Sequence, residues 1–278
     1  MNQHTNHTKK RNHLYWLTFA LGMLCTTAFA EQFRFKHFNT SDGLPSNSIR
    51  CITQDYRGFI WAGTENGISR FNGNSFKVFK NIPGDSTSIG SNYINCIFED
   101  KQKNFWIGTD CGVFIYTPET ESFSSFSKTT KENIQILTGT VHIIEDKKGN
   151  IWFSTEGQGV FCYNQKTKEL QQLLPSPTIP DSSNNTNFIL SLFIDSRENI
   201  WVSARTAKYP LYLFDEQKKQ FLPYPISDYS SPLIHAINED TEGYLWLGSW
   251  DDGLYKLDVE AGRAKRFFSP EKKKGISH

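Results

Sequence analysis

Hydrophobic residues recur along this chain in short runs, and turns rich in Gly, Asp and Asn separate the runs. No stretch keeps helical spacing of its apolar residues over a useful length. The clearest example is a group of four runs, which we interpret as four short strands joined by tight turns. These predicted strands are Ser48–Gln54, Phe59–Thr64, Ile68–Asn72 and Phe76–Lys80.

The same group of four strands occurs five times. Each copy is centred on a tryptophan, and the intervals between these tryptophans are 45, 46, 49 and 45 residues. The tryptophans are Trp61, Trp106, Trp152, Trp201 and Trp246. An aspartate stands six residues before each of them, at positions 55, 100, 146, 195 and 240.

A four-stranded unit with a period of about 40–50 residues is typical of a β-propeller blade. A single blade cannot bury both of its faces, but stacked copies can, so we expect the tryptophans to pack between sheets rather than to bind a ligand. An acid that recurs in every copy is interpreted as a turn residue and not as a catalytic one. The predicted blades cover residues of about 46–80, 91–126, 138–172, 187–223 and 232–269.

The two ends of the chain predict an incomplete ring. Residues 33–38 resemble an outer strand that has no inner strands before it, so we assign this stray strand to a blade whose other strands are not in the chain. Residues 275–278 resemble the segments that precede the inner strands. We therefore expect an all-β fold, five blades plus one stray outer strand, as an N-terminal fragment of a seven-bladed propeller.

Residues 1–30 are predicted to be an export signal. A basic start at Lys9–Arg11 precedes an apolar run at Leu14–Leu24, and Ala28-Phe29-Ala30 has the small residues that a signal peptidase requires. The run is too short for a permanent membrane helix. Residues 1–30 hold three basic and no acidic residues, so removing them leaves 27 Lys and Arg against 29 Asp and Glu. This balance argues against nucleic acid as a partner.

Four cysteines follow the predicted signal: Cys51, Cys96, Cys111 and Cys162. They lack the paired spacing of a zinc site and the density of a disulfide scaffold, so we expect small buried thiols. No pair of histidines has metal-ligand spacing, and no set of Ser, His and Asp residues marks a catalytic triad. The sequence therefore predicts no catalytic residue, no metal and no cofactor.

The repeated pattern closely resembles the two-component regulator propeller repeat of hybrid two-component sensors from Bacteroidetes-like bacteria. In the first copy, the residues that carry this resemblance follow residues 43–49 and are Asp55, Gly58, Ile60, Trp61, Gly63, Thr64, Gly67, Ile68 and Phe71. The third and fourth copies depart from the pattern at residues 153–155 and 202–205. The resemblance covers essentially all of residues 31–278.

The resemblance implies a ligand-sensing region in the periplasm that binds an oligosaccharide from glycan breakdown and thereby regulates polysaccharide-utilisation genes. It also implies a parent protein that is anchored in the inner membrane and carries further blades, a histidine kinase and DNA-binding modules, none of which this chain contains. A homodimer of the full-length receptor is a further partner state that the resemblance leaves open.

Loops that vary between copies are the best candidates for binding, because a rigid scaffold presents them while the strands repeat. Sugars are bound by amide, carboxylate and guanidinium groups together with an aromatic face. Trp250 is the sharpest candidate, since it lies outside the repeated position. The candidate ligand-binding residues are Asn66, Asn92, Tyr93, Asp110, Glu156, Arg205, Lys208, Trp250 and Asp251.

Two other functions stay open. Paired carboxylates on propellers can hydrolyse glycosides, and Asp251 with Asp252 or Glu65 could serve in a secreted propeller enzyme. A propeller that only binds other proteins is the second alternative.

Overall fold

The computed structural model divides the chain into two compact units, Met1–His37 and Phe38–His278. It describes residues 35–128, 134–175, 187–205, 209–231, 233–250 and 252–267. The predicted export signal, residues 1–30, lies outside the described residues. All the strands that the structure describes belong to the second unit.

The second unit contains five antiparallel sheets of four strands each, in which the chain runs from one strand to its neighbour. The prediction of an all-β propeller fold built from four-stranded blades is confirmed; the seven-bladed ring stays a prediction. Sheet 1 consists of β1 (Ile49–Gln54), β2 (Ile60–Thr64), β3 (Gly67–Phe71) and β4 (Phe76–Phe79). Sheet 2 consists of β5 (Ile94–Glu99), β6 (Phe105–Thr109), β7 (Gly112–Thr117) and β8 (Ser122–Ser125).

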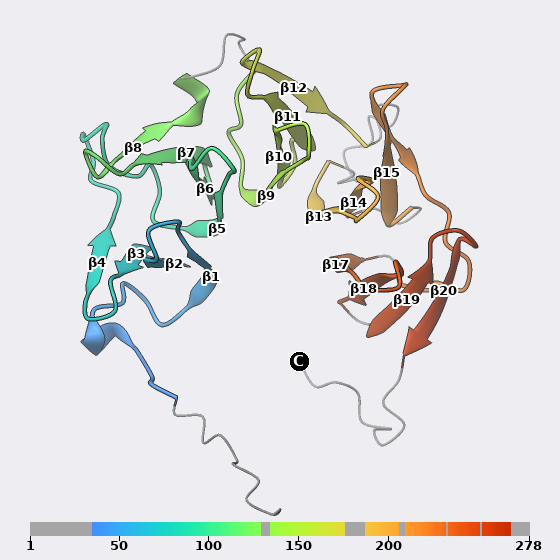
Figure 1. Cartoon of the computed structure of the whole chain (residues 1–278), viewed down its shortest axis with the longest axis horizontal. Coiled ribbons are helices and arrows are strands. Elements are labelled where there is room, and N and C mark those ends of the chain that lie inside the picture. The colour runs from blue at the N-terminus through green and yellow to red at the C-terminus, as the bar shows by residue number, and fades with distance from the viewer. Residues whose placement is uncertain are drawn as a thin grey trace, which may run out of the picture. The chain divides into compact units, whose positions relative to one another are not determined.

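The remaining three sheets repeat this order (Figure 1). Sheet 3 consists of β9 (Thr140–Glu145), β10 (Asn150–Thr155), β11 (Val160–Asn164) and β12 (Glu169–Leu173). Sheet 4 consists of β13 (Ile189–Ile194), β14 (Ile200–Ala204), β15 (Leu211–Asp215) and β16 (Gln220–Pro223). Sheet 5 consists of β17 (Ile234–Glu239), β18 (Leu245–Ser249), β19 (Leu254–Asp258) and β20 (Arg263–Phe267). The helical elements described are two short 3₁₀ turns, Thr40–Asp42 and Phe126–Lys128.

A hydrogen bond between the repeated Trp and the repeated Asp organises every sheet. The indole N–H donates to a carboxylate oxygen, and the distance between Trp Nε1 and Asp Oδ2 is 2.9 Å in all five copies. The pairs are Trp61–Asp55, Trp106–Asp100, Trp152–Asp146, Trp201–Asp195 and Trp246–Asp240. The interpretation of these aspartates as structural turn residues is confirmed.

The second carboxylate oxygen closes the turn between the first two strands. In sheet 1, Asp55 Oδ1 accepts hydrogen bonds from the backbone N–H groups of Arg57 and Phe59, each at 3.0 Å. The residue between these two is Gly58, whose φ of +88° is the left-handed conformation that glycine adopts without strain. One buried carboxylate therefore fixes both the turn and the indole ring, and a charged acceptor makes these hydrogen bonds strong.

Consecutive sheets pack face to face through four hydrophobic clusters. Each cluster joins the repeated Trp of one sheet to the second strand of the next sheet. The ring of Trp61 lies 4.7 Å from that of Phe105, and the ring of Trp106 lies 5.7 Å from that of Phe153. The first four tryptophans are buried for this reason, whereas Trp246 in the last sheet is only partly buried.

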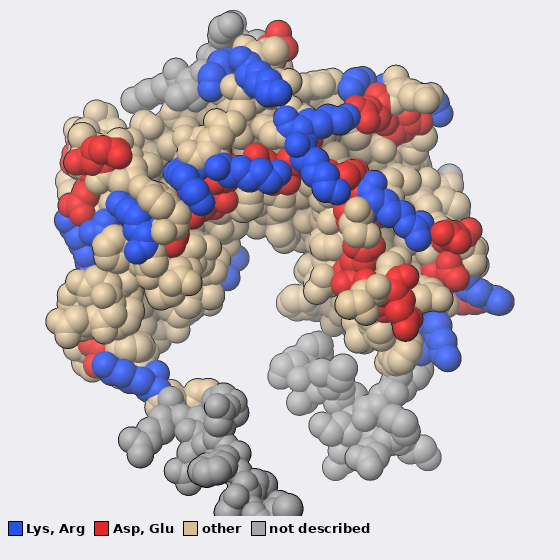
Figure 2. Space-filling view, viewed as in Figure 1, with Lys and Arg blue, Asp and Glu red and all other residues tan. Residues whose placement is uncertain are grey.

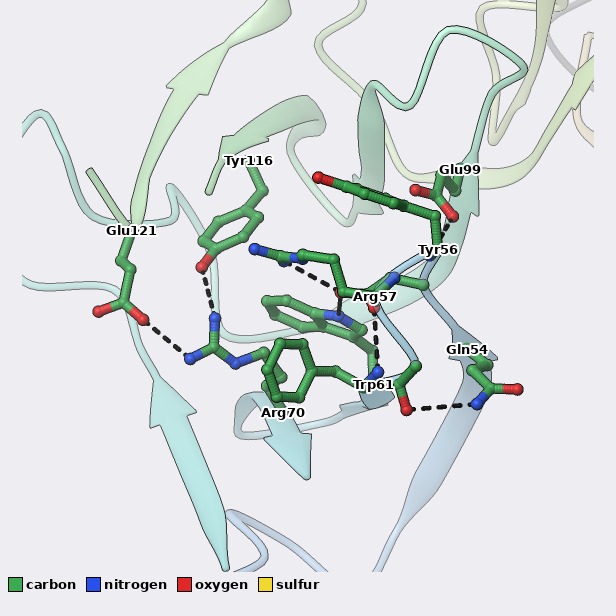
Figure 3. Close-up of polar contacts among 11 residues, drawn as sticks. Gln54, Tyr56, Arg57, Trp61, Arg70, Glu99, Tyr116 and Glu121 are labelled. Atoms are coloured by element: carbon green, nitrogen blue, oxygen red, sulfur yellow. Dashed lines mark hydrogen bonds and ion pairs between the residues drawn. The ribbon is translucent and has the colours of Figure 1, made fainter. Parts of the chain in front are cut away.

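A glutamate of one sheet also fixes the turn of the sheet before it. Glu99 at the end of β5 accepts the backbone N–H of Tyr56 at 2.9 Å (Figure 3). Glu145 accepts the backbone N–H of Lys101 at 2.8 Å, and Glu239 accepts that of Ser196 at 2.7 Å. Neighbouring sheets are thus held in one register by polar contacts as well as by apolar ones.

In sheet 4 the same contact is made from a different position. Strand β13 ends at Ile194, so its last residue has no carboxylate, and Glu198 in the following turn accepts the backbone N–H of Lys147 at 3.1 Å. A glutamate therefore accepts the same backbone N–H in the turn of the preceding sheet, although it stands four residues after the end of the first strand instead of at its last position.

The segment at residues 35–38 forms no strand, and residues 33–34 lie outside the described residues. Phe38 instead packs on sheet 1, with its ring 5.0 Å from Phe71 and 5.4 Å from Phe76. A strand needs hydrogen bonds from a neighbour, and none of the five sheets pairs with this segment. Its predicted partner strands are not among the described residues, so the stray outer strand stays a prediction.

The four cysteines are free thiols in the structure. Cys51, Cys96 and Cys162 are partly buried, whereas Cys111 is exposed. The expectation of a buried thiol is wrong for Cys111, because this residue stands in the two-residue turn between β6 and β7, where the side chain is open to solvent.

Replacing Asp100 by Ala is expected to lower the free energy of unfolding by about 3 kcal/mol, because the buried indole N–H of Trp106 loses a charged acceptor. Urea denaturation followed by tryptophan fluorescence measures this change. The matched control is Asp110→Asn, an exposed aspartate of the same sheet, which should leave the unfolding midpoint unchanged. Equal midpoints for Asp100→Ala and the wild type would contradict a stabilising role for this hydrogen bond.

Candidate functional site

The first strand of every sheet begins at the same end of the unit as the turn between the second and third strands, because the start of the first strand pairs with the end of the second. We call this end the loop face. It comprises the starts of β1, β5, β9, β13 and β17 together with the turns that follow β2, β6, β10, β14 and β18.

Each first strand carries a β-bulge close to its start. The register shifts by one residue at the same position in all five sheets. A bulge leaves one residue unpaired and re-aims its side chain. The five bulge residues are Arg50, Asn95, Val141, Leu190 and His235.

Two of these bulge residues organise the polar groups of the loop face. Arg50 donates from Nη1 to the hydroxyl of Tyr93 at 2.8 Å, and its guanidinium carbon lies 4.6 Å from the centre of the Tyr93 ring. Glu65 approaches the same guanidinium at 3.9 Å. A cation, a phenol and a carboxylate from sheets 1 and 2 therefore meet at one exposed point of the face.

The second group joins sheets 4 and 5. Trp250 is 64% exposed, and its ring centre lies 4.9 Å from that of His235. Burial lowers the pKa of His235, and the positive charge of Arg205 lowers it further. This pKa direction favours a neutral imidazole at pH 7. The group presents an exposed indole, an imidazole and a guanidinium, a set that suits a ligand with both an apolar face and polar substituents.

The other predicted residues are tied into the scaffold. The Asn66 amide donates to the backbone oxygen of Pro45 at 3.1 Å, and the Asn92 side-chain oxygen accepts the backbone N–H of Asn81 at 2.8 Å. Asp110 and Glu156 have exposed side chains in their turns. These four residues hold loops in place or stand alone, and neither group described above includes them.

Lys208 and Asp251 lie outside the described residues. Of the nine predicted residues, Tyr93 belongs to the group at sheets 1 and 2, and Arg205 and Trp250 belong to the group at sheets 4 and 5. His235 links these two predicted residues, because its ring contacts that of Trp250 and its pKa responds to the charge of Arg205.

Sequence reasoning missed Arg50 and His235. Both occupy the bulge position, which directly follows the first Ile of the inner strand and differs in every copy. The sequence did show that the residue at this position differs between copies while the rest of the inner strand is similar. That the position is a bulge depends on how the strands pair, and the spacing of residues in the sequence does not show it.

Acidic and basic side chains alternate along the sheets on the face shown in Figure 2, and neither charge gathers into one large patch there. Among the described residues, no three His, Cys, Asp or Glu side chains lie together in a way that could hold a metal ion. The part of the chain that the structure describes also has no helix long and apolar enough to cross a membrane.

The repeat is similar to those of known proteins. The family model "Two component regulator propeller" matches residues 43–66, 88–111 and 137–157. Histidine kinase P4 from Formosa agariphila is 46% identical over 59 residues, which are 21% of this chain and 4% of that kinase.

Solved structures share the fold at low identity. The extracellular domain of a hybrid two component system from B. thetaiotaomicron has a TM-score of 0.58 at 18% identity, over 87% of this chain and 38% of that chain. A virginiamycin B lyase from Staphylococcus aureus has a TM-score of 0.58 at 14% identity, over 81% of this chain and 71% of that chain. The matched part is thus a small fraction of the kinase and less than half of the extracellular domain, and the fold occurs both in a two component system and in a lyase.

Replacing Arg205 by Gln is expected to raise the pKa of His235 toward its ordinary value, because a nearby positive charge is removed. Titration of the histidine ring resonances by NMR measures this pKa. The matched control, Arg50→Gln, removes an arginine from the other group and should leave His235 unchanged. An identical His235 pKa in wild type and Arg205→Gln would show that the two side chains do not form one group.

Proposed function

Since this chain carries two-component regulator propeller repeats, we propose that it is part of the ligand-sensing region of a hybrid two-component sensor. The repeats match the family model in three segments, and a segment of 59 residues is 46% identical to a histidine kinase. The chain itself holds propeller blades, so the signalling chemistry belongs to other parts of such a receptor.

The observation that carries a binding role is the exposed indole of Trp250, whose ring lies tilted against His235, a residue whose pKa responds to the charge of Arg205. A large exposed aromatic side chain on a rigid scaffold is a ready contact for a ligand. The sheets below it are fixed by buried hydrogen bonds and packing, so the group requires little ordering when a ligand binds.

The proposed ligand is an oligosaccharide derived from a glycan. The C–H face of a sugar ring stacks on an indole, and sugar hydroxyls accept hydrogen bonds from guanidinium and imidazole groups. The second group, Arg50 with Tyr93 and Glu65, offers further donors and acceptors on the same loop face. An oligosaccharide has several sugar units, so different units can contact different groups.

The predicted export signal supports a periplasmic location in this proposal, with the parent receptor anchored in the inner membrane. Ligand binding would then bias the receptor between signalling states and regulate genes for polysaccharide use. Such coupling requires that the ligand bind the two states with different affinity.

Replacing Trp250 by Ala is expected to weaken oligosaccharide binding about 5- to 30-fold, because a stacking surface worth roughly 1–2 kcal/mol is lost. Isothermal titration calorimetry with a panel of plant and algal oligosaccharides, one compound at a time, measures the affinity. Reaction products should not accumulate in the wild-type samples.

The matched control is Tyr56→Ala, which removes another exposed aromatic ring, at the turn between β1 and β2. This turn lies at the opposite end of the strands, so the control should bind like the wild type. Hydrolysis of any oligosaccharide by the wild type would favour the enzyme alternative. Equal affinities of Trp250→Ala and wild type would show that the indole of Trp250 does not contribute to ligand binding.

A further inference from the structure

One position on the third strand of each sheet lies beside the repeated Trp. The strand register pairs the two residues directly in all five sheets, so their side chains share one face. The residues at this position are Arg70, Ile115, Cys162, Leu213 and Lys256. Cys162 has the shortest side chain of the five and leaves the most room beside its indole.

Between sheets 1 and 2, this room is filled by Arg70. Its guanidinium carbon lies 4.7 Å from the ring centre of Phe59, and its two terminal nitrogens donate to the hydroxyl of Tyr116 at 3.0 Å and to the carboxylate of Glu121 at 2.8 Å. Figure 3 shows the arginine reaching from its own sheet to these two acceptors on the next one. A cationic side chain thus closes the junction of sheets 1 and 2.

Between sheets 3 and 4, the corresponding space is a cleft of about 250 Å³. Trp152, Cys162 and Gln171 line it from sheet 3, and Phe214 and Lys219 line it from sheet 4. The ring of Phe214 lies 5.0 Å from the indole of Trp152, so one wall of the cleft is aromatic.

The two acceptors of Arg70 are both replaced at this second junction. Phe214 pairs with Phe221 as Tyr116 pairs with Phe123, so Phe214 stands where Tyr116 stands but lacks the hydroxyl. Lys219 stands where Glu121 stands: each is the residue before the fourth strand, with φ of +53° and +50°. The charge that faces the cleft is therefore reversed, from a carboxylate to an ammonium.

Lys219 is the lysine of this cleft that forms no direct ion pair with any described residue, and its charge adds a smaller effect to that of Lys148 in lowering the pKa of the Glu216 carboxylate. Lys148 and Glu216 form an ion pair across the two sheets, and the carboxylate of Asp146 accepts hydrogen bonds within its own sheet, including the one from Trp152. Among the described residues, Lys219 makes no ion pair or hydrogen bond. An anionic group in the cleft would supply a direct partner.

Neutral donors complete the lining. The side-chain oxygen of Asn164 accepts two backbone N–H groups of its own turn, which leaves its amide nitrogen for a ligand. Gln171 is exposed at the rim with a second amide. Burial raises the pKa of Cys162 to about 12, so its thiol is protonated at neutral pH and adds no negative charge.

We propose that this cleft is a second ligand site, which binds a small hydroxylated carboxylate of the size of one sugar acid. The carboxylate pairs with Lys219, the ring face packs on Trp152 and Phe214, and the amides of Asn164 and Gln171 bind hydroxyl groups. The cleft is smaller than the roughly 300 Å³ at which pockets for drug-sized ligands begin, so it suits one ring and not a chain.

The site is independent of the loop face. Its charged lining residues, Asp146, Lys148, Glu216 and Lys219, lie in the turn between the first and second strands of sheet 3 and in the turn between the third and fourth strands of sheet 4, at the end of the sheets opposite to the loop face. The two ligand sites can therefore be tested separately, and Trp250→Ala should leave this one intact.

The test is calorimetric titration of sodium glucuronate into the full chain, with glucose as the neutral probe of the same shape. Glucuronate is expected to bind at least about tenfold more tightly than glucose, because only the acid pairs with Lys219. Replacing Cys162 by Leu, the residue at the same position of sheet 4, fills the cleft and should weaken glucuronate binding by at least about tenfold. An unchanged urea midpoint would show that Cys162→Leu retains the fold.

Lys219→Glu restores the charge found at Glu121 and should abolish the preference for glucuronate over glucose without touching the core. Lys218→Ala is its control, since Lys218 is the adjacent lysine and pairs with Asp215 within its own turn. Absence of glucuronate binding to the wild type, equal affinity for glucose, or unchanged affinity in Lys219→Glu would each overturn the proposal. The Lys219 variants keep the test decisive even if Cys162→Leu fails to fold.

Discussion

The hydrogen bond from the repeated indole to the repeated aspartate is the constraint on which the rest of this structure depends. It recurs at 2.9 Å in all five sheets, with both groups buried in the first four, and uses one oxygen of a carboxylate whose other oxygen closes the adjacent turn. A buried carboxylate is costly unless donors satisfy it, and a buried indole N–H is costly without an acceptor. Each group removes the cost of burying the other, so the two residues are required together in every copy.

The orientation of the indole determines how one sheet meets the next. Once Asp55 holds the N–H edge of Trp61, the ring stands across the sheet face and contacts Phe105 of the following sheet. The last sheet shows what happens to the indole when no described sheet follows. Trp246 keeps its bond to Asp240, but it is only partly buried because no described sheet covers that face. Burial of each indole therefore requires two neighbouring sheets, and the hydrogen bond within one sheet orients the indole for contact with the next sheet.

Differences at fixed places of the repeat are what create candidate sites. At the bulge position, Arg50 and His235 bring polar groups together on the loop face, whereas Val141 and Leu190 do not. Beside the indole of Trp152, the short side chain of Cys162 leaves a cleft at the junction of sheets 3 and 4, whereas Arg70 fills the corresponding space between sheets 1 and 2. A constant scaffold with a few variable positions separates stability from recognition, because ligand contacts can change without loss of the buried pairs.

Much of the fold could be predicted from the sequence because its causes are local. Each copy contains a tryptophan with an aspartate six residues before it, and the regular spacing from Trp61 to Trp246 shows that this pattern repeats five times. The sites could not be predicted to the same depth. The pairing of Arg50 with Tyr93, the contact of Trp250 with His235 and the exposure of Cys111 depend on bulges, turns and the distance between sheets. Asn92 illustrates the difficulty, since its amide, chosen as a ligand contact, is occupied by the backbone of Asn81.

The most direct test of the account is the rate at which the indole N–H protons exchange with deuterium, resolved for each Trp by NMR. The account predicts that Trp61, Trp106, Trp152 and Trp201 exchange slowest, that Trp246 exchanges faster, and that the exposed Trp250 exchanges fastest. Rapid exchange at the first four, or protection of Trp246 equal to theirs in the monomeric chain, would contradict the claim that bonded indoles buried between successive sheets hold this structure together.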